Sequence, residues 1–140
     1  MTDPLLITIE IEPAGSVRSS VIWMHGLGAD ANDFGPIVPE MCLSTELGIR
    51  FVFPNAPVRP VTINGGMRMR AWYDVLTIDL PRREDHDGVY DSEQAIVALI
   101  EREKQRGVPA EQIVLAGFSQ GGAMALHTGL RCPDRLAGIL

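Results

Sequence analysis

The stretch Ile113-Val-Leu-Ala-Gly-Phe-Ser-Gln-Gly-Gly122 decides the fold of this chain. Its first four residues are apolar and typical of a short buried strand. Gly117-Phe-Ser-Gln-Gly121 follows as a complete G-x-S-x-G motif, and a helical pattern begins at Ala123. A strand, a tight turn and a helix in this order predict a nucleophile elbow, which aims the hydroxyl of Ser119 outward. The alternative is a glycine-rich turn with an incidental serine.

The composition predicts one globular domain. The chain has 140 residues, of which 46% are hydrophobic and 21% charged, enough for a sizeable core. The formal net charge of −6 and the lack of a basic stripe argue against nucleic acid as a partner. No apolar run is long enough for a membrane span, and the N-terminus does not resemble a signal peptide. Cys42 and Cys132 are expected to be reduced thiols, so we expect a cytoplasmic protein.

Expected strands and helices alternate along the chain, which predicts an α/β fold with a mainly parallel sheet. The expected strands cover 5–11, 20–24, 49–53, 113–116 and 136–140. Three helices are expected. The first covers 34–45, and the second is capped by Asp91 or Ser92 and ends at Arg106. The third runs from the elbow to about 131. Residues 55–80 show little periodicity and predict a long functional loop, and 82–87 predict a charged linker.

Three loops are expected to meet at one edge of this sheet. They begin at His25, Asn55 and Ser119, and each follows an expected strand. In parallel sheets, functional sites form outside the carboxyl ends of the strands. We therefore expect the three loops to line one site.

Five motifs carry a resemblance to a known family. They are Trp23-Met-His-Gly-Leu-Gly-Ala-Asp30, Pro54-Asn-Ala-Pro57, Pro60-Val-Thr-Ile-Asn-Gly-Gly66, Met69-Arg-Ala-Trp-Tyr-Asp74 and Gly117-Phe-Ser-Gln-Gly-Gly122. In this order they resemble the phospholipase/carboxylesterase family, which includes bacterial carboxylesterases and acyl-protein thioesterases. The resemblance extends from about residue 5 to the end of the chain and implies an α/β-hydrolase fold.

The resemblance also implies a serine hydrolase mechanism. Ser119 would be the catalytic nucleophile, and the backbone N–H groups of Leu27 and Gln120 would form the oxyanion hole. Two fixed N–H dipoles stabilise the negative charge that develops on the carbonyl oxygen, by about 3 kcal/mol per donor. No metal or cofactor is expected, because a serine mechanism needs none.

A substrate pocket beside the serine is implied in the same way. Gly26, Trp72 and Leu76 would line it, although a plain core position is the alternative for Trp72. The substrate would be a small carboxylic ester, a lysophospholipid or an acyl thioester on a protein. Three arginines within 59–70 either meet an anionic head group or face solvent.

A serine nucleophile needs a base, and the base needs an acid that orients it. In this fold both follow the nucleophile in the chain. After Ser119 the sequence offers only His127, about 12 Å along the elbow helix, and Asp134, roughly 20 Å away, and neither is expected to reach it. His25 is expected to be structural and His86 to be solvated. We therefore expect one partial α/β-hydrolase domain that lacks its C-terminal part and is weakly active or inactive.

Two other functions fit parts of the sequence. One is a catalytically dead scaffold that binds acyl ligands. The other is a nucleotide-binding domain, because Gly26-Leu-Gly-Ala-Asp-Ala31 matches G-x-G-x-x-G/A after a strand. The carboxylate that this pattern needs after the next strand is missing at Phe53-Pro-Asn55.

Separately, residues 136–140 are expected to expose an unpaired sheet edge, which favours self-association.

Overall fold

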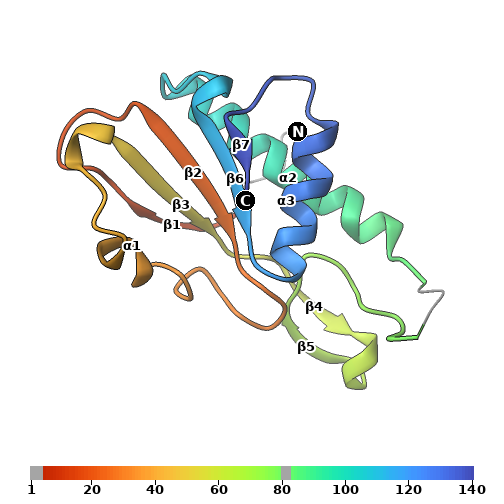
Figure 1. The fold of residues 1–140 in the computed structure, drawn as a ribbon. Helices are drawn as coiled ribbons and strands as arrows, with labels where there is room; N and C mark the ends of the chain where they lie inside the picture. Colours follow the sequence, from red (N-terminus) through yellow and green to blue (C-terminus); the bar gives the residue numbers. More distant parts are fainter. Residues whose placement is uncertain (1–4, 80–82) are drawn as a thin grey trace.

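A five-stranded sheet with the order β1-β3-β2-β6-β7 forms the centre of the computed structural model, which describes residues 5–79 and 83–140 (Figure 1). Its strands are β1 (Thr8–Ile11), β2 (Ser19–Met24), β3 (Ile49–Pro54), β6 (Ile113–Gly117) and β7 (Gly138–Ile139). The pairs β2–β3, β2–β6 and β6–β7 are parallel, and only β1 runs antiparallel to its neighbour. The structure thus confirms the predicted α/β fold with a mainly parallel sheet.

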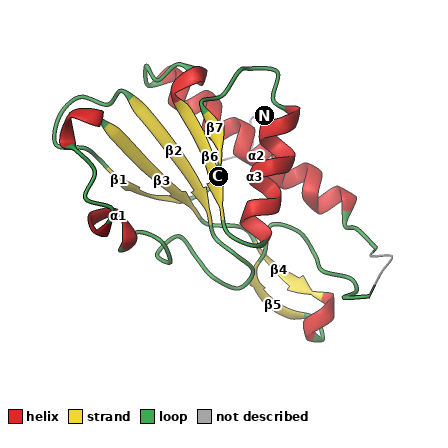
Figure 2. Cartoon of the chain, viewed as in Figure 1, coloured by secondary structure: helices red, strands yellow, loops and turns green. Residues whose placement is uncertain are grey.

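Helices cover both faces of this sheet (Figure 2). They are α1 (Ile37–Glu40), α2 (His86–Gln105) and α3 (Gln120–Arg131). Along strand β2, successive side chains point to opposite faces of the sheet, so its sequence shows which residues pack on each face. Ile22 and Met24 are fully buried in the core beneath α2 and α3, whereas Val21 and Trp23 pack in a second cluster near α1. No helix in the described ranges is long and apolar enough to cross a membrane.

The predicted helix over 34–45 is wrong. Within this segment the structure has only the four residues of α1 and then the 3₁₀ turn η1 (Thr45–Leu47). Pro36 and Pro39 have no N–H to donate, which weakens a helix at this point. Cys42 then adopts a φ of 49°, a left-handed conformation that a regular helix cannot accommodate.

The segment predicted as an irregular loop contains a hairpin. Strands β4 (Val58–Val61) and β5 (Met67–Arg70) pair antiparallel outside the main sheet, and the 3₁₀ turn η2 (Thr62–Asn64) lies between them. Most of the hairpin is exposed, including Val58 and Met67. Met67-Arg-Met-Arg70 does alternate, but four residues are too few to predict a strand alone, and Val58-Arg-Pro-Val61 of β4 contains a proline.

Helix α2 begins earlier than predicted. It starts at His86, and its N-cap is Asp85, whose Oδ1 accepts the Gly88 N–H at 3.0 Å. The predicted caps Asp91 and Ser92 lie inside the helix, so that prediction is wrong. Positions 85–87 of the predicted charged linker are the cap and first turn of α2, 83 and 84 precede the cap, and position 82 lies outside the described residues. His86 is solvated as expected, with 84% of its side chain exposed.

A buried carboxylate fastens the other end of α2 to the sheet. Glu103 is fully buried, and its Oε1 accepts a hydrogen bond from the Ser20 hydroxyl on β2 at 2.7 Å. Arg50 on β3 and Arg106 both donate to the same carboxylate at 3.0 Å. A buried charge is tolerated only when it is paired in this way. The helix ends at Gln105 with Arg106 as its C-cap, at the predicted place.

Within the described residues, strand β7 forms one edge of the sheet, and β1 forms the other. Strand β7 pairs with β6 through Gly138 and Ile139 and is only two residues long. The expected edge is therefore present, whereas self-association through it stays a prediction.

Cys42 and Cys132 are both free thiols.

Candidate active site

Ser119 lies in a strained turn between β6 and α3. Its backbone has φ 55° and ψ −116°, a combination that L residues rarely adopt. The residue is exposed, and its side chain does not cap α3. Strain of this kind costs on the order of 1–3 kcal/mol and is concentrated at functional sites. The turn therefore presents a hydroxyl group at the carboxyl end of the sheet.

Two glycines make this turn possible. A Cβ on Gly117 would lie 2.2 Å from the carbonyl oxygen of Gly121, and a Cβ on Gly121 would lie 2.3 Å from that of Met24. Both distances are far below van der Waals contact. Only glycine fits at either position, as the sequence indicated, because α3 leaves β6 directly against the end of β2.

A second turn lies beside the serine. The Ala29 N–H donates to the Gly26 carbonyl at 3.2 Å, and a Cβ on Gly26 would lie 3.6 Å from the Cβ of Ser119. Leu27 follows Gly26 in this turn, and Gln120 follows the serine. Within the described residues, the backbone N–H groups of Leu27 and Gln120 have no acceptor. Two unpaired backbone donors therefore flank Ser119.

His25 joins the ends of β2 and β3. Its Nε2 accepts the Ala56 N–H at 3.0 Å, so the ring proton must lie on Nδ1, which donates to the Gly26 carbonyl at 2.7 Å. Burial lowers the pKa of His25, and the hydrogen bond to Gly26 only partly offsets this effect. The imidazole is therefore a neutral structural group, as expected, and the three predicted loops do meet at one edge.

Trp72 belongs to the core. It is fully buried, and its indole N–H donates to the His25 carbonyl at 2.8 Å. The Trp72 backbone N–H donates to Oε1 of Gln120 at 2.7 Å, and Nε2 of Gln120 donates to the Tyr73 carbonyl at 2.8 Å. The amide of Gln120 thus ties the elbow to a segment 47–48 residues earlier in the chain. No local pattern in the sequence could reveal this tie.

A cavity of 340 Å³ opens one helical turn beyond Ser119, between α3, α2 and the segment after Trp72. Ala123, whose N–H donates to the Ser119 carbonyl at 3.0 Å, is on its wall. Leu76 also lies on this wall, whereas Gly26 and Trp72 do not. The described lining residues are Tyr73, Asp74, Val75, Leu76, Thr77, Arg83, Glu84, Asp85, His86, Val89, Ala123, Met124 and His127.

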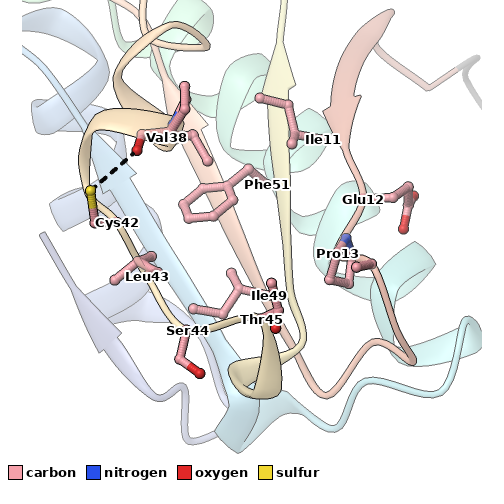
Figure 3. Close-up of a pocket in the computed structure, with 12 residues that line it drawn as sticks. Ile11, Glu12, Pro13, Val38, Cys42, Leu43, Ser44, Thr45, Ile49 and Phe51 are labelled. Carbon is pink, nitrogen blue, oxygen red and sulfur yellow. Dashed lines mark hydrogen bonds between the residues drawn. The ribbon is translucent and has the colours of Figure 1, made fainter.

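Another hollow, of 230 Å³, lies between β1, β3 and the segment after α1. Figure 3 shows Ile11, Ile49 and Phe51 lining one side and Cys42 and Leu43 on the other. None of the residues around Ser119 contributes to it. It is therefore separate from the candidate site.

The groups that could have activated Ser119 are engaged elsewhere. His127 Nε2 lies 3.6 Å from Oε2 of Glu93, and Asp134 forms an ion pair with Lys104 at 2.9 Å. In the described part of the chain, no imidazole forms a hydrogen bond with Ser119. The described residues also contain no group of three or more His, Cys, Asp or Glu side chains that could hold a metal ion.

The nucleotide-binding alternative is wrong. A dinucleotide pattern requires a helix directly after its glycines, because the helix N-terminus binds the pyrophosphate. Here Gly28 adopts a left-handed φ of 77°, and the next helix is the four-residue α1, which begins only at Ile37. Gly26 instead lies against the elbow, and the Gly28 N–H donates to the Arg70 carbonyl of β5 at 2.9 Å.

The profile of the phospholipase/carboxylesterase family matches residues 8–140. The chain belongs to this family. The match covers all five strands of the sheet, the elbow and the turn at Gly26. It confirms the resemblance and the α/β-hydrolase fold, and proteins of the family are named as carboxylesterases and acyl-protein thioesterases.

Among individual family members, acyl-protein thioesterase 1 of Schizosaccharomyces pombe is 38% identical over 135 residues, which are 96% of this chain and 59% of that protein. Acyl-protein thioesterase 1 of Neurospora crassa is 41% identical over 128 residues, 87% of this chain and 52% of that protein. The chain thus spans between about half and three fifths of these family members.

Solved structures of the family show the same arrangement. Arabidopsis thaliana SOBER1 superposes with a TM-score of 0.81 at 33% identity, over 88% of this chain and 60% of that one. Acyl-protein thioesterase 2 of Zea mays gives a TM-score of 0.75 at 29% identity, over 88% of this chain and 50% of that one.

Proposed function

We propose that this chain carries the nucleophile of a serine hydrolase that cleaves carboxylic esters or thioesters through an acyl-serine intermediate. The observation that carries the proposal is the exposed Ser119 at φ 55°, beside a turn with an unpaired N–H. An incidental serine in a plain turn has no reason to occupy a strained conformation.

The reaction would proceed at Ser119. Its Oγ attacks the carbonyl carbon, and the carbonyl oxygen becomes an oxyanion. The backbone N–H groups of Leu27 and Gln120 would stabilise that charge by about 3 kcal/mol each. Gln120 is also the first residue of α3, so the positive end of the helix dipole adds to this effect. Collapse of the intermediate breaks the bond to the leaving oxygen or sulfur, which takes up the proton lost by the Ser119 hydroxyl and departs as an alcohol or a thiol. Water then hydrolyses the acyl-serine to a carboxylic acid and restores the serine hydroxyl.

The substrate class follows from the family. Two family members are named acyl-protein thioesterase, which favours an acyl thioester on a protein over a small ester or a lysophospholipid. The cavity that includes Ala123 would receive the acyl chain, with Leu76 on its wall, and Gly26 would lie beside Ser119 rather than in the cavity. Trp72 would position this wall from the core rather than touch the substrate. The cytoplasmic location expected from the sequence remains part of this proposal.

The test is covalent labelling of Ser119. The described residues supply no base for it, so we expect slow labelling by a fluorophosphonate and at most feeble hydrolysis of a short p-nitrophenyl ester. In a comparable serine enzyme, loss of triad members costs about a millionfold in rate, and the oxyanion hole retains a residual rate.

Peptide mapping of the labelled chain should find the adduct on Ser119 and none on Ser16, which is also exposed but lies outside the elbow. Ser119→Ala should abolish the adduct. Equal labelling of both serines would show that the elbow does not activate Ser119. In that case the second candidate, a catalytically dead scaffold that binds acyl ligands, would be favoured.

A further inference from the structure

One short segment contacts both turns of the candidate site. It begins at Arg70, the last residue of β5, and Figure 1 shows its hairpin below the carboxyl ends of β2 and β6. The Arg70 carbonyl accepts the Gly28 N–H at 2.9 Å. The Trp72 indole N–H donates to the His25 carbonyl at 2.8 Å. The turn that carries the Leu27 N–H is therefore fastened to this segment on both sides of Leu27.

The same segment holds the elbow through the side chain of Gln120. Its Oε1 accepts the Trp72 backbone N–H at 2.7 Å, and its Nε2 donates to the Tyr73 carbonyl at 2.8 Å. Gln120 is buried, and the Trp72 carbonyl accepts a further hydrogen bond from the Ser92 hydroxyl on α2. One amide group therefore connects the residue after the nucleophile to a segment that α2 also holds.

Both proposed oxyanion donors, the backbone N–H groups of Leu27 and Gln120, are thus held by residues 70–73. Two donors can stabilise one oxyanion only when each lies about 2.7–3.1 Å from its oxygen, and a displacement of about 1 Å can cost about a hundredfold in rate. The sheet does not set this separation by itself. The Phe118 N–H donates to the Met24 carbonyl at 3.1 Å, but Leu27 lies three residues beyond this bond. The tie through Gln120 supplies the missing constraint.

We propose that the side chain of Gln120 is a positioning residue for the oxyanion hole. Its amide holds Trp72, and the indole of Trp72 holds the turn of Leu27, so the two backbone donors keep a fixed separation. This inference rests on the proposed function, because it gives both N–H groups one oxyanion to bind. If the amide only filled space in the core, any side chain of similar size would serve as well.

Two substitutions at Gln120 separate positioning from stability. Gln120→Met has a similar size but offers no acceptor to the Trp72 N–H. Gln120→Glu keeps that acceptor, although it loses the donor to the Tyr73 carbonyl and buries a carboxyl group. Both should lower the free energy of unfolding, because each leaves buried polar groups unpaired. Gln112→Met is the matched control, since Gln112 is exposed and its Oε1 accepts the Ser19 hydroxyl at the far end of β6 from the elbow.

Nitrogen-15 relaxation of the Leu27 amide measures the positioning without catalysis. We expect an order parameter of about 0.85 in the unmodified protein, the value of a rigid backbone. Gln120→Met should lower it toward about 0.6, whereas Gln120→Glu and Gln112→Met should leave it at about 0.85. Trp72→Phe removes the indole donor but keeps a ring in the core, so it should also mobilise Leu27 while the amide of Gln120 stays rigid. This variant carries the test if Gln120→Met does not fold.

The inference is overturned if the Leu27 amide is mobile in the unmodified protein or stays rigid in both Gln120→Met and Trp72→Phe. It is also overturned if Gln120→Glu or Gln112→Met mobilises Leu27 as much as Gln120→Met does.

Fluorophosphonate labelling of Ser119 on the same samples reports the proposed function separately, and its rate should fall about tenfold or more in Gln120→Met. Absence of labelling in the unmodified protein would refute the hydrolase but leave the tie from Gln120 to Leu27 intact. Labelling at equal rates, with a rigid Leu27 in every variant, would keep the hydrolase and refute the positioning role.

Discussion

At the scale of single residues, His25 holds a neutral imidazole in a place where a charged one does not fit. Its Nε2 must accept the Ala56 N–H, so a second ring proton would face a donor. Through its carbonyl it also receives the indole N–H of Trp72. The turn with the Leu27 N–H therefore depends on one uncharged side chain.

This dependence predicts how stability varies with pH. Burial holds the pKa of His25 below its ordinary value of 6.5. At pH values between the lowered pKa of the folded chain and 6.5, His25 binds a proton in the unfolded chain but not in the folded chain. The free energy of unfolding should therefore fall as the pH is lowered through about 6.5.

Urea unfolding measured between about pH 8 and pH 5 checks this expectation. His25→Gln removes the titrating group and should flatten the part of the slope that lies below about pH 6.5, although it lowers stability overall. His86→Gln, on the exposed first residue of α2, should keep the slope of the unmodified protein. Identical slopes in all three proteins would contradict the role of His25.

At the scale of elements, the start of α2 shows how a local rule can select the wrong residue. Asp85, Asp91 and Ser92 are all good N-caps by residue type. Asp85 is the cap because its Oδ2 also accepts the Asp74 N–H at 2.8 Å and lies 3.8 Å from Arg59 of β4. These partners are distant in sequence, so propensity alone cannot rank the three candidates.

Replacing the cap should destabilise the chain at this point. Asp85→Ala removes the acceptor for the Gly88 N–H and the tie to Asp74, and we expect a loss of about 1–2 kcal/mol in the free energy of unfolding. Asp91→Ala, at an exposed position inside α2, should change it by less than about 0.5 kcal/mol. Chemical denaturation followed by circular dichroism measures both. An equal loss for the two variants would favour the cap that the sequence predicted.

At the scale of the whole molecule, the sheet has β7 at its edge in the described residues. An edge strand offers unpaired backbone groups to another chain. Leu140, which follows β7, is 80% exposed and adds an apolar side chain to this edge. We therefore expect association that grows with protein concentration.

Sizing chromatography over a range of concentrations tests the edge. Leu140→Lys should reduce association, because a lysine on an edge strand opposes pairing with a second chain. Leu130→Lys is a matched control, since Leu130 is 77% exposed but lies on α3. A chain that remains monomeric at every concentration, or an equal effect of both variants, would be evidence against association through β7.

The sequence by itself determined the elbow, the order of strands and helices, and the meeting of three loops at one edge. These features follow from local physics, because the elbow motif, the apolar runs and the helix signals each lie within a few residues of the chain. The reason that Gly121 must be glycine is tertiary, because a Cβ there would meet Met24 of β2. Tertiary structure alone decided the rest. The tie from Gln120 to Tyr73 and the choice of Asp85 as the cap depend on partners far along the chain, which no short window of sequence contains.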